Sequence, residues 1–486
     1  MLFSPTALQH ESEVPLYRQV FEQIAARIRS GDLSRGTRLP ATRELAGTLG
    51  LNRTTISAAY ELLESEGLIS GQVGRGSFVT GTTDAGGVDW SALLQQDNRP
   101  SPVPPAQNIS FSMSRPSRDL FPLDEFRASC EAVLARGDLA SILQLGSPSG
   151  YEPLRRHLLE AARAQQLAGP GDDLIITNGC QQALDLVGRV LLKPGDTVVV
   201  EDPIYPGLKN LLLGMGAQLV AIPVGSDGVD AAHLERVLAR EQPRLVVVTS
   251  NFQNPTGATI SLSTRQRLVE AARAARVPVI ENDPYGDLRY NGQPLPALKK
   301  LDEHGGTVLL RSFSKVSFPG LRVGWALGPK PLIDRLRNAK EASDLHTDQL
   351  SQAVLLEFAE SGRLEAHRQR VLRAGSERLA ATLDGCAQYF PPGTRWTRPE
   401  GGMNVWVRLP DPLDAGELLL RAQEQGVAYS PGRYFAVSRL DPGALRLSFA
   451  GLTPEQIGAG LAILGKIVTS ELAGVQQNRE PAPAMV

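Results

Sequence analysis

The chain has 486 residues, 42% of them hydrophobic, which is enough for two or more domains with sizeable cores. Its formal charge of −2 excludes a general attraction to nucleic acid, so any DNA binding needs locally placed charge. Three widely spaced cysteines argue against a disulfide framework or a metal site and fit a reducing cytoplasm. There is no charged-then-apolar leader and no run of about eighteen apolar residues, so we expect a cytoplasmic protein without a membrane span.

The first 80 residues predict three short helices followed by two short strands. Apolar spacing places the helices at residues 16–28, 42–49 and 52 to the stop at Gly67, and the strands at 68–70 and 77–80. Asn52 is a favourable N-cap for the third helix. With a glycine-rich turn at 74–76, this order describes a winged helix-turn-helix, whose third helix enters the major groove of DNA.

The charges of this region fall where DNA contacts are expected. Residues 1–80 hold eight arginines and eight acidic residues, but most of the arginines lie at helix starts and in the turn. Such arginines suit phosphate groups, and polar side chains at the start of the third helix suit base edges. The predicted contacts to double-stranded operator DNA are Arg38, Arg43, Asn52, Arg53, Thr54, Thr55, Arg75 and Gly76. The alternative is a small helical dimerisation module with solvated arginines.

Composition changes at residues 81–109. Glycine-rich and proline-rich stretches there are typical of an interdomain linker, with a short docking helix expected at Trp90–Leu94. The predicted domains are therefore a DNA-binding domain at 1–80, a linker at 81–109 and a second domain at 110–474. A disordered tail is expected at 475–486.

Residues 110–474 alternate predicted strands with predicted helices, which is typical of a mostly parallel sheet covered on both faces. Five apolar runs indicate buried strands, at residues 174–177, 197–201, 245–250, 277–281 and 307–311. A large domain is expected at about 147–340, with a smaller one built from both flanks. Ligand-binding side chains should follow the strands, because such sheets bind ligands at the carboxyl ends.

Lys315, one of only eight lysines, stands among polar residues that follow these strands. A pyridoxal phosphate site needs an amine for the aldehyde, a clamp for the phosphate, an acid beside the pyridine nitrogen and donors to the ring hydroxyl. The chain offers Asn254, an acid near position 283, Tyr285, Ser312, Ser314, Lys315 and Arg322 in that order, and Tyr205 can stack on the ring. Taken singly, each has an ordinary structural explanation, such as a surface lysine or a turn asparagine.

These motifs resemble two known families. Residues 14–17, 39–46, 51–56 and 74–79 are similar to the DNA-binding domain of GntR-type transcription regulators. Residues 110–470 resemble fold type I aminotransferases of the kynurenine and aminoadipate aminotransferase group. The combination resembles the MocR subfamily of bacterial regulators. It implies an α/β fold class, with an N-terminal winged helix-turn-helix followed by aminotransferase-like large and small domains.

The resemblance also implies residue roles. Lys315 would hold pyridoxal phosphate as a Schiff base, and Arg446 would bind the carboxylate of a substrate or effector. Cofactor contacts are implied for Cys180, Gln181, Tyr205, Asn254, Tyr285, Ser312, Ser314 and Arg322. In the GntR-like region Arg43 and Asn52 to Thr55 would contact the operator, assisted by Arg75 and Gly76. The resemblance further implies a homodimer, with the head of one chain over the aminotransferase-like domain of the other.

Three positions depart from the aminotransferase pattern. The acid that usually faces the pyridine nitrogen falls on Asn282 by its spacing to Tyr285, so either the neighbouring Asp283 takes that role, which we prefer, or the electron sink is weakened. A tyrosine that reaches the phosphate across the dimer is replaced by Leu145, and a phosphate serine by Cys180, a poorer donor.

Two functions remain. In the first, the protein is a pyridoxal phosphate-dependent transcription regulator that senses a small amino compound and changes how its heads bind DNA. In the second, it is an active amino acid aminotransferase of the 2-oxoglutarate type with an accessory DNA-binding head. We favour the regulator, because a dedicated aminotransferase has no use for such a head.

Overall fold

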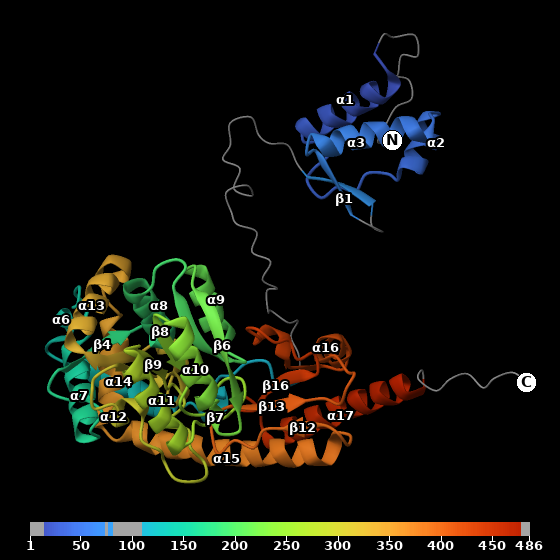
Figure 1. Ribbon diagram of the computed structural model, residues 1–486. Helices are drawn as coiled ribbons and strands as arrows, with labels where there is room; N and C mark the ends of the chain where they lie inside the picture. Colours follow the sequence, from blue (N-terminus) through green and yellow to red (C-terminus); the bar gives the residue numbers. More distant parts are fainter. Residues whose placement is uncertain (1–13, 73–75, 81–108, 478–486) are drawn as a thin grey trace, which may run out of the picture. The chain divides into compact units, whose positions relative to one another are not determined.

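The computed structural model describes residues 14–72, 76–80 and 109–477, and at residues 72 and 475–477 it describes the backbone alone. The chain divides into two compact units, residues 1–103 and 104–486, and each is described by itself (Figure 1). Arg75, the expected helix at Trp90–Leu94 and nearly all of the expected linker lie outside the described residues.

The N-terminal unit has the predicted order of three helices and a two-stranded wing. Its elements are α1 (Leu16–Arg29), α2 (Thr42–Leu49), α3 (Arg53–Ser65), β1 (Ile69–Gln72) and β2 (Gly76–Val79), the two strands being antiparallel. Ile24, Leu45 and Ile56 are buried in one core between the helices. Gly50 ends α2 with a φ of 67°, and the Asn52 side chain accepts from Thr54 N at 3.3 Å to begin α3. This tight turn fixes α3 against α2.

An eight-stranded sheet forms the centre of the C-terminal unit. Its strands are β4 (Asp172–Thr177), β5 (Thr197–Asp202), β6 (Gln218–Gly225), β7 (Gly228–Val229), β8 (Leu245–Val248), β9 (Val279–Asn282), β10 (Thr307–Ser312) and β11 (Gly324–Pro329). They lie in the order β4-β11-β10-β9-β8-β5-β6-β7. β10, β9, β8, β5 and β6 are parallel, whereas β11 is antiparallel to both of its neighbours and β7 is antiparallel to β6. The α/β fold class is confirmed.

All five predicted strands are present, but the sequence did not predict β6, β7 or β11. β11 reads Gly-Trp-Ala-Leu-Gly-Pro. Glycine and proline have low strand propensity, so the sequence does not indicate a strand here, although the burial of its neighbours stabilises one. β6 is near the edge of the sheet and only partly buried, so it lacks the continuous apolar run of the central strands.

Helices cover both faces of this sheet (Figure 1). They are α5 (Leu123–Leu134), α6 (Leu139–Ile142), α7 (Glu152–Ala164), α8 (Gly179–Leu191), α9 (Pro206–Gly214), α10 (Ala231–Glu241), α11 (Leu262–Ala275), α12 (Leu298–Leu301), α13 (Lys330–Asp344) and α14 (Gln349–Glu360). One apolar cluster joins α8, α9 and α13 to Ile280 and Leu310 of the sheet. A second joins α10 and α11 to Val246 and Val279. Side chains that alternate along β9 therefore face different helices.

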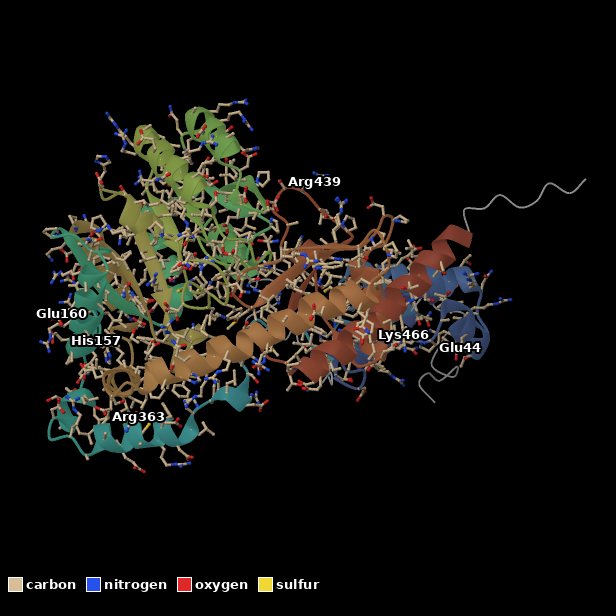
Figure 2. The ribbon with its side chains drawn as sticks, turned by 90° about the horizontal axis from the view of Figure 1, so that it is seen from below. Glu44, His157, Glu160, Arg363, Arg439 and Lys466 are labelled. Atoms are coloured by element: carbon tan, nitrogen blue, oxygen red, sulfur yellow. The ribbon has the colours of Figure 1, made fainter. Side chains whose placement is uncertain are left out.

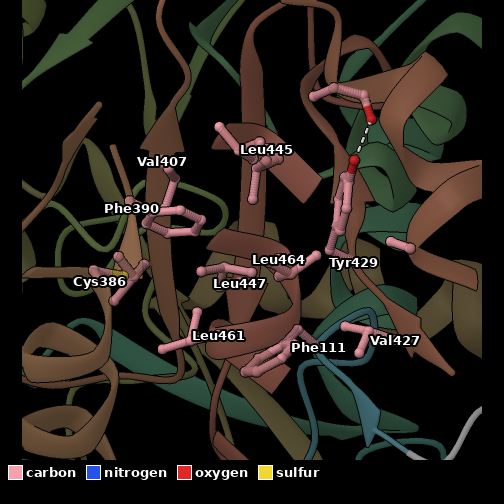
Figure 3. Packing of buried hydrophobic residues seen from close by; sticks show 14 of the residues in the cluster. Phe111, Cys386, Phe390, Val407, Val427, Tyr429, Leu445, Leu447, Leu461 and Leu464 are labelled. Atoms are coloured by element: carbon pink, nitrogen blue, oxygen red, sulfur yellow. Dashed lines mark hydrogen bonds between the residues drawn. The ribbon is translucent and has the colours of Figure 1, made fainter. Parts of the chain in front are cut away.

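A smaller domain is built from the two flanks of the large one. It contains β3 (Ile109–Ser110), β12 (Arg395–Trp396), β13 (Asn404–Arg408), β14 (Val427–Ala428), β15 (Ser430–Pro431), β16 (Ala444–Ser448), α15 (Arg363–Tyr389), α16 (Ala415–Glu424) and α17 (Pro454–Gln477). Its core packs Phe111 with Leu447 and Leu461 (Figure 3). Within it the Tyr429 hydroxyl donates to the Ala415 carbonyl at 2.6 Å, the bond drawn in Figure 3. β3 pairs with β14, so the chain enters this domain directly after the expected linker.

The last helix, α17, extends to Gln477, three residues into the segment predicted as a tail. Within the described residues it is the one helix whose length and composition would allow it to cross a membrane. Ile457, Leu461 and Leu464 of this helix are buried in the small domain, which is the same pattern that a core helix shows. Charged residues such as Glu160, Arg439 and Lys466 lie exposed on the outside of the unit (Figure 2).

Candidate functional site

Lys315 lies at the end of β10, in the short 3₁₀ turn η3 (Phe313–Lys315). Its Nζ donates to the Ser114 carbonyl at 2.9 Å and lies 5.4 Å from the centroid of the Tyr285 ring. Ser114 belongs to residues 109–115, which we call the post-linker segment. The amine therefore lies between the residues that follow β9 and the post-linker segment.

A cluster of donors lies beside Lys315. The Ser312 and Ser314 hydroxyls are 2.9 Å apart, and an Arg322 Nη1 lies 3.4 Å from Ser314 Oγ. Arg322 Nη2 donates to the Asn178 carbonyl at 3.0 Å, at the start of α8. A side chain at Gly179, whose φ is 77°, would collide with Arg322 at 2.6 Å, so only glycine lets the arginine approach the helix. Hydroxyls, a guanidinium and a helix N-terminus thus converge as a dianion requires.

Asp344, at the end of α13, accepts hydrogen bonds from side chains at the start of α8 and so stabilises its first turn. Its Oδ2 accepts from Asn178 Nδ2 at 2.9 Å and from Gln182 Nε2 at 2.5 Å. The fully buried Lys340 donates to both of its carboxylate oxygens, at 2.6 and 2.8 Å. Gln182 Oε1 in turn accepts from Asn178 N at 2.8 Å. This network fixes the direction of the first turn of α8.

Cys180, Gln181 and Tyr205 lie around the same helix start. Burial raises the pKa of the Cys180 thiol to about 12, so the thiol stays neutral although Lys315 and Arg322 are close enough to oppose the shift. The exposed Gln181 donates to the Gly207 carbonyl at 3.3 Å. Tyr205 is 41% exposed, with its ring over Gly207. Leu145 is 72% exposed and contributes no polar group.

Arg446 is buried and reaches the same post-linker segment. It donates from Nη1 to Asn254 Oδ1 at 3.0 Å, from Nη2 to Ser430 Oγ at 3.0 Å, and also to the Ser112 carbonyl. These described partners are all neutral, and the Phe435 ring lies 5.0 Å from the guanidinium. Burial lowers the pKa of Arg446 to about 10, although Tyr285 and Tyr205 oppose the shift. A desolvated guanidinium with neutral partners favours an incoming carboxylate.

The adjacent Asn282 and Asp283 are both buried but have different surroundings. Asp283 accepts from Asn251 Nδ2 at 2.8 Å and from Arg311 Nη2 at 3.2 Å, one bond to each carboxylate oxygen. Asn282 Oδ1 has no hydrogen-bond partner within the described part of the chain. Asp283 thus already holds two protein donors, whereas Asn282 Oδ1 holds none of them, and the preference for Asp283 as the partner of a pyridine nitrogen stays a prediction.

In the N-terminal unit the predicted DNA-contacting side chains lie on the surface. Arg43 of α2 and Asn52, Arg53 and Thr54 at the start of α3 are exposed, and Thr55 is half-buried. Arg38 is exposed and its guanidinium approaches Gly76 of the wing, with Nε 3.1 Å from the place of a Cβ. The Tyr60 hydroxyl donates to the Pro40 carbonyl at 2.8 Å and ties α3 to the chain that leads into α2. Arg43 and the start of α3 are thus held on a rigid frame.

Several contributors were missed from the sequence. The carbonyls of Ser112 and Ser114 carry no sequence signal, since every residue has a carbonyl. Asp344 is 166 residues from Asn178, its partner, and nothing in the intervening sequence marks the pair. Ser430 stands in a short strand beside Arg446, and only the register of β15 and β16 reveals their proximity.

Comparison with known proteins agrees with this arrangement. Residues 16–79 match the family of bacterial regulatory proteins, gntR family, and residues 122–464 match aminotransferase class I and II. The probable rhizopine catabolism regulatory protein MocR of Rhizobium meliloti is 30% identical over 468 residues, covering 93% of this chain and 94% of that protein. The chain belongs to the MocR-type transcription regulators.

Solved aminotransferase structures match the C-terminal unit of this regulator. Pyrococcus horikoshii kynurenine aminotransferase, in complex with PMP, aligns with a TM-score of 0.76 and 33% identity over 79% of this chain and 98% of its own. The α-aminoadipate aminotransferase of Thermus thermophilus, complexed with N-(5'-phosphopyridoxyl)-L-leucine, aligns with a TM-score of 0.71 and 36% identity over 75% of this chain and 93% of its own. The cofactor of the regulator is therefore pyridoxal phosphate, and the amine, hydroxyl and guanidinium groups around Lys315 fit it.

Proposed function

We propose that this regulator senses a small amino compound that carries a carboxylate, and responds by changing its affinity for operator DNA. Lys315 supplies the amine beside which the cofactor is held, and Arg446 supplies the site for the carboxylate. Both groups lie at one short stretch of backbone, because each donates to a carbonyl within Ser112 to Ser114. A compound with an amine and a carboxylate would engage both groups.

The observation that carries the proposal is the position of the post-linker segment. Its Ser114 carbonyl accepts from Lys315 and its Ser112 carbonyl accepts from Arg446. A cofactor bound to the lysine and a carboxylate bound to the arginine compete with these two carbonyls for their donors. Since this segment is the first described stretch after the connection to the DNA-binding unit, its release is a direct covalent route for the signal.

The cofactor's surroundings follow from the same geometry. When bound, pyridoxal phosphate supplies an aldehyde that combines reversibly with amines and a ring that withdraws electrons. Ser312, Ser314, Arg322 and the first turn of α8, with Cys180 and Gln181, would hold its phosphate. Asn254 and Tyr285 would donate to the ring hydroxyl, and Tyr205 would cover the ring. Desolvation by these side chains strengthens each polar contact.

On the DNA side, the start of α3 would read base edges in the major groove. Asn52, Arg53 and Thr54 are exposed there, and Arg43 and Arg38 would contact phosphates on either side. Gly76, with Arg75, would bring the wing close to the backbone. A homodimer with the head of each chain over the partner's aminotransferase-like domain, in the cytoplasm, would present two such surfaces and gain avidity.

A second candidate is a working aminotransferase that uses 2-oxoglutarate. Lys315, Arg322, Asn254 and Arg446 provide the groups that amine transfer needs. Keto acid formation from amino acids and 2-oxoglutarate separates the two candidates. Turnover on the order of 1 s⁻¹ over many cycles is ordinary enzyme speed and would favour the enzyme, whereas a single half-cycle or none favours the regulator.

The regulator is tested by footprinting the full-length protein, loaded with pyridoxal phosphate, on the DNA upstream of its own gene. Amino acids and amines that change the visible absorbance of the bound cofactor are then added one at a time. We expect at least one of them to change operator affinity by about tenfold or more, which corresponds to about 1.4 kcal/mol. Specific protection that responds to none of them, or no specific protection at all, would remove the proposal.

Hydrogen exchange tests whether the signal passes through the post-linker segment. Amides of residues 109–115 should exchange faster when such a compound is bound, because the segment loses two hydrogen bonds to its carbonyls. Amides of α11, on the far side of the sheet, serve as the control and should not change. Unchanged exchange in the segment, together with a DNA response, would mean that the signal leaves the site by another path.

A further inference from the structure

Two neighbouring polar residues stand where β9 ends. Side chains alternate along a strand, so Asn282, the last residue of β9, lies on the face of Ile280, and Asp283 follows the strand. Ile280 packs in the cluster formed with α8, whose first turn carries the cofactor-binding groups. Glu281 accepts from Leu298 N and Lys299 N of α12, both at 2.9 Å. Asn282 therefore lies on the face of the sheet that α8 covers.

The carboxylate of Asp283 already accepts hydrogen bonds from other side chains. Its side chain is fully buried, and Asn251 and Arg311 each occupy one of its oxygens. Asn251 is itself held by the fully buried Arg265, which donates to Asn251 Oδ1 at 2.7 Å. Turning the carboxylate of Asp283 toward α8 would leave Arg311 without its acid and Asn251 without its acceptor. Such a loss costs several kcal/mol, so the arrangement is fixed.

Asn282 is 7% exposed, and its Oδ1 is buried without a partner among the described residues. Buried amide groups without partners are rare in folded proteins, and they often mark a place where a ligand completes the hydrogen bonding. The carbonyl and amino ends of an amide are interchangeable by rotation, so the same side chain can accept from a ligand or donate to it. Asn282 is thus available to a ligand, whereas Asp283 already holds Asn251 and Arg311.

We propose that Asn282 contacts the pyridine nitrogen of the bound cofactor and keeps this nitrogen unprotonated. A neutral amide donates equally well to an unprotonated ring nitrogen, but it does not balance the charge of a protonated one. Arg322 would be matched by the phosphate that it holds, and Asp283 is neutralised by Arg311. A cation on the ring nitrogen would then have no unpaired acid beside it, which is unfavourable.

The inference deepens the proposed function, on which its regulatory meaning rests. An unprotonated ring withdraws electrons weakly, so removal of a proton from the bound amino compound is slow. Binding and release of the amine at Lys315 do not need that withdrawal. The site therefore holds and exchanges amino compounds without converting them quickly, which suits a reporter of their concentration.

The test uses the full-length protein loaded with pyridoxal phosphate that carries ¹⁵N in the ring. At neutral pH the wild-type ring nitrogen should show no one-bond coupling to a proton, and Asn282→Asp should introduce that coupling. A coupled, protonated ring nitrogen in the wild type would overturn the inference by itself, so the result does not depend on whether a variant folds.

A matched variant separates contact from general charge. Asn251→Asp adds the same negative charge between Asp283 and Arg265, which are the partners of Asn251, and should leave the ring unprotonated. If it protonates the ring as well as Asn282→Asp does, the contact assigned to Asn282 is wrong. Conversion of one equivalent of bound amino acid in Asn282→Asp should also accelerate, on the order of 100-fold, as expected for a restored charge partner.

These readouts need no DNA, so they fail or succeed separately from the proposed function. A protonated ring with an intact operator response would remove only the role of Asn282. An unprotonated ring without any operator response would support that role and remove the regulator proposal.

Discussion

The two units of this protein present their functional side chains in opposite ways. In the winged helix, Arg43, Asn52 and Arg53 stand exposed on a core that is complete without them. In the aminotransferase-like unit, Arg446 and Asp283 are buried, and each is bound to several other residues of the site. Substitutions in the first unit should therefore change DNA affinity with little effect on stability. Those in the second should change ligand binding and the surrounding structure together.

The largest expected effect is at Lys315. Lys315→Ala removes the covalent hold on the cofactor, so retention of pyridoxal phosphate should fall by roughly 1000-fold, or about 4 kcal/mol. Dialysis followed by the visible absorbance of the protein measures this. The exposed Lys300→Ala is the control and should keep its colour. Operator binding should stay measurable in both variants, and retained colour in Lys315→Ala would contradict the assignment.

A buried histidine should make the stability of the second unit depend on pH. His367 is 1% exposed and stacks on Phe318 with centroids 6.3 Å apart. Burial, aided by nearby Arg370 and opposed by Glu125, lowers its pKa to about 4. Above pH 6.5 the ring is neutral in both states, and as the pH falls from 6.5 to 4 the unfolded chain takes up the proton first. Stability is therefore lost over this window, by about 3 kcal/mol.

The measurement is urea unfolding of the wild type and of His367→Phe at pH 7 and pH 4.5. Glu201 acts in the opposite direction, because burial raises the pKa of its carboxyl to about 7, but it is present in both proteins and cancels in the difference. We expect the variant to lose less stability on acidification. Equal losses would show that His367 takes up its proton in the folded state.

Arg446 tests the ligand end of the site. Arg446→Ala should weaken the binding of a carboxylate-bearing amino compound by about 100-fold, or about 2.7 kcal/mol, because a buried charged contact is lost. Titration of the cofactor's visible absorbance with the compound gives the affinity. Arg439→Ala, an exposed arginine of the same domain, is the control. An unchanged affinity in Arg446→Ala would place the carboxylate elsewhere.

The smallest effect is expected for the exposed side chains of the DNA-binding unit. Arg53→Ala should weaken operator binding by about tenfold, as for one lost base or phosphate contact, and leave the melting temperature unchanged. Arg29→Ala, which removes a surface ion pair with Glu66 at 3.4 Å, should change neither property by much. Equal operator affinity for Arg53→Ala and the wild type would count against α3 as the reading helix.

Much of the architecture could be predicted from the sequence, because helix spacing, strand runs and glycine stops are local signals. Lys315, Arg322 and Arg446 could be named from short motifs for the same reason. The surroundings of Asn282 and Asp283 could not be told apart, since they depend on Asn282 being the last residue of β9 and Asp283 the first residue after it. The residue at which that strand ends is decided by its pairing with β10, not by local sequence.

The contacts of the post-linker segment were also hidden from the sequence. They use backbone carbonyls, and Ser114 and Lys315 are 201 residues apart. Asp344 and Asn178 are joined over a similar separation by a side-chain bond at 2.9 Å. Such contacts follow from packing of whole elements, so they become visible only when the fold is known.

The most direct test of the account is the operator affinity of the full-length protein loaded with pyridoxal phosphate, measured with and without the amino acid that shifts its absorbance, in the wild type and in Arg446→Gln. The account predicts a change of about tenfold or more in the wild type and little or none in the variant at the same amino acid concentration. Equal responses in the two proteins, or an amino acid that occupies the wild-type site without changing operator affinity, would contradict it.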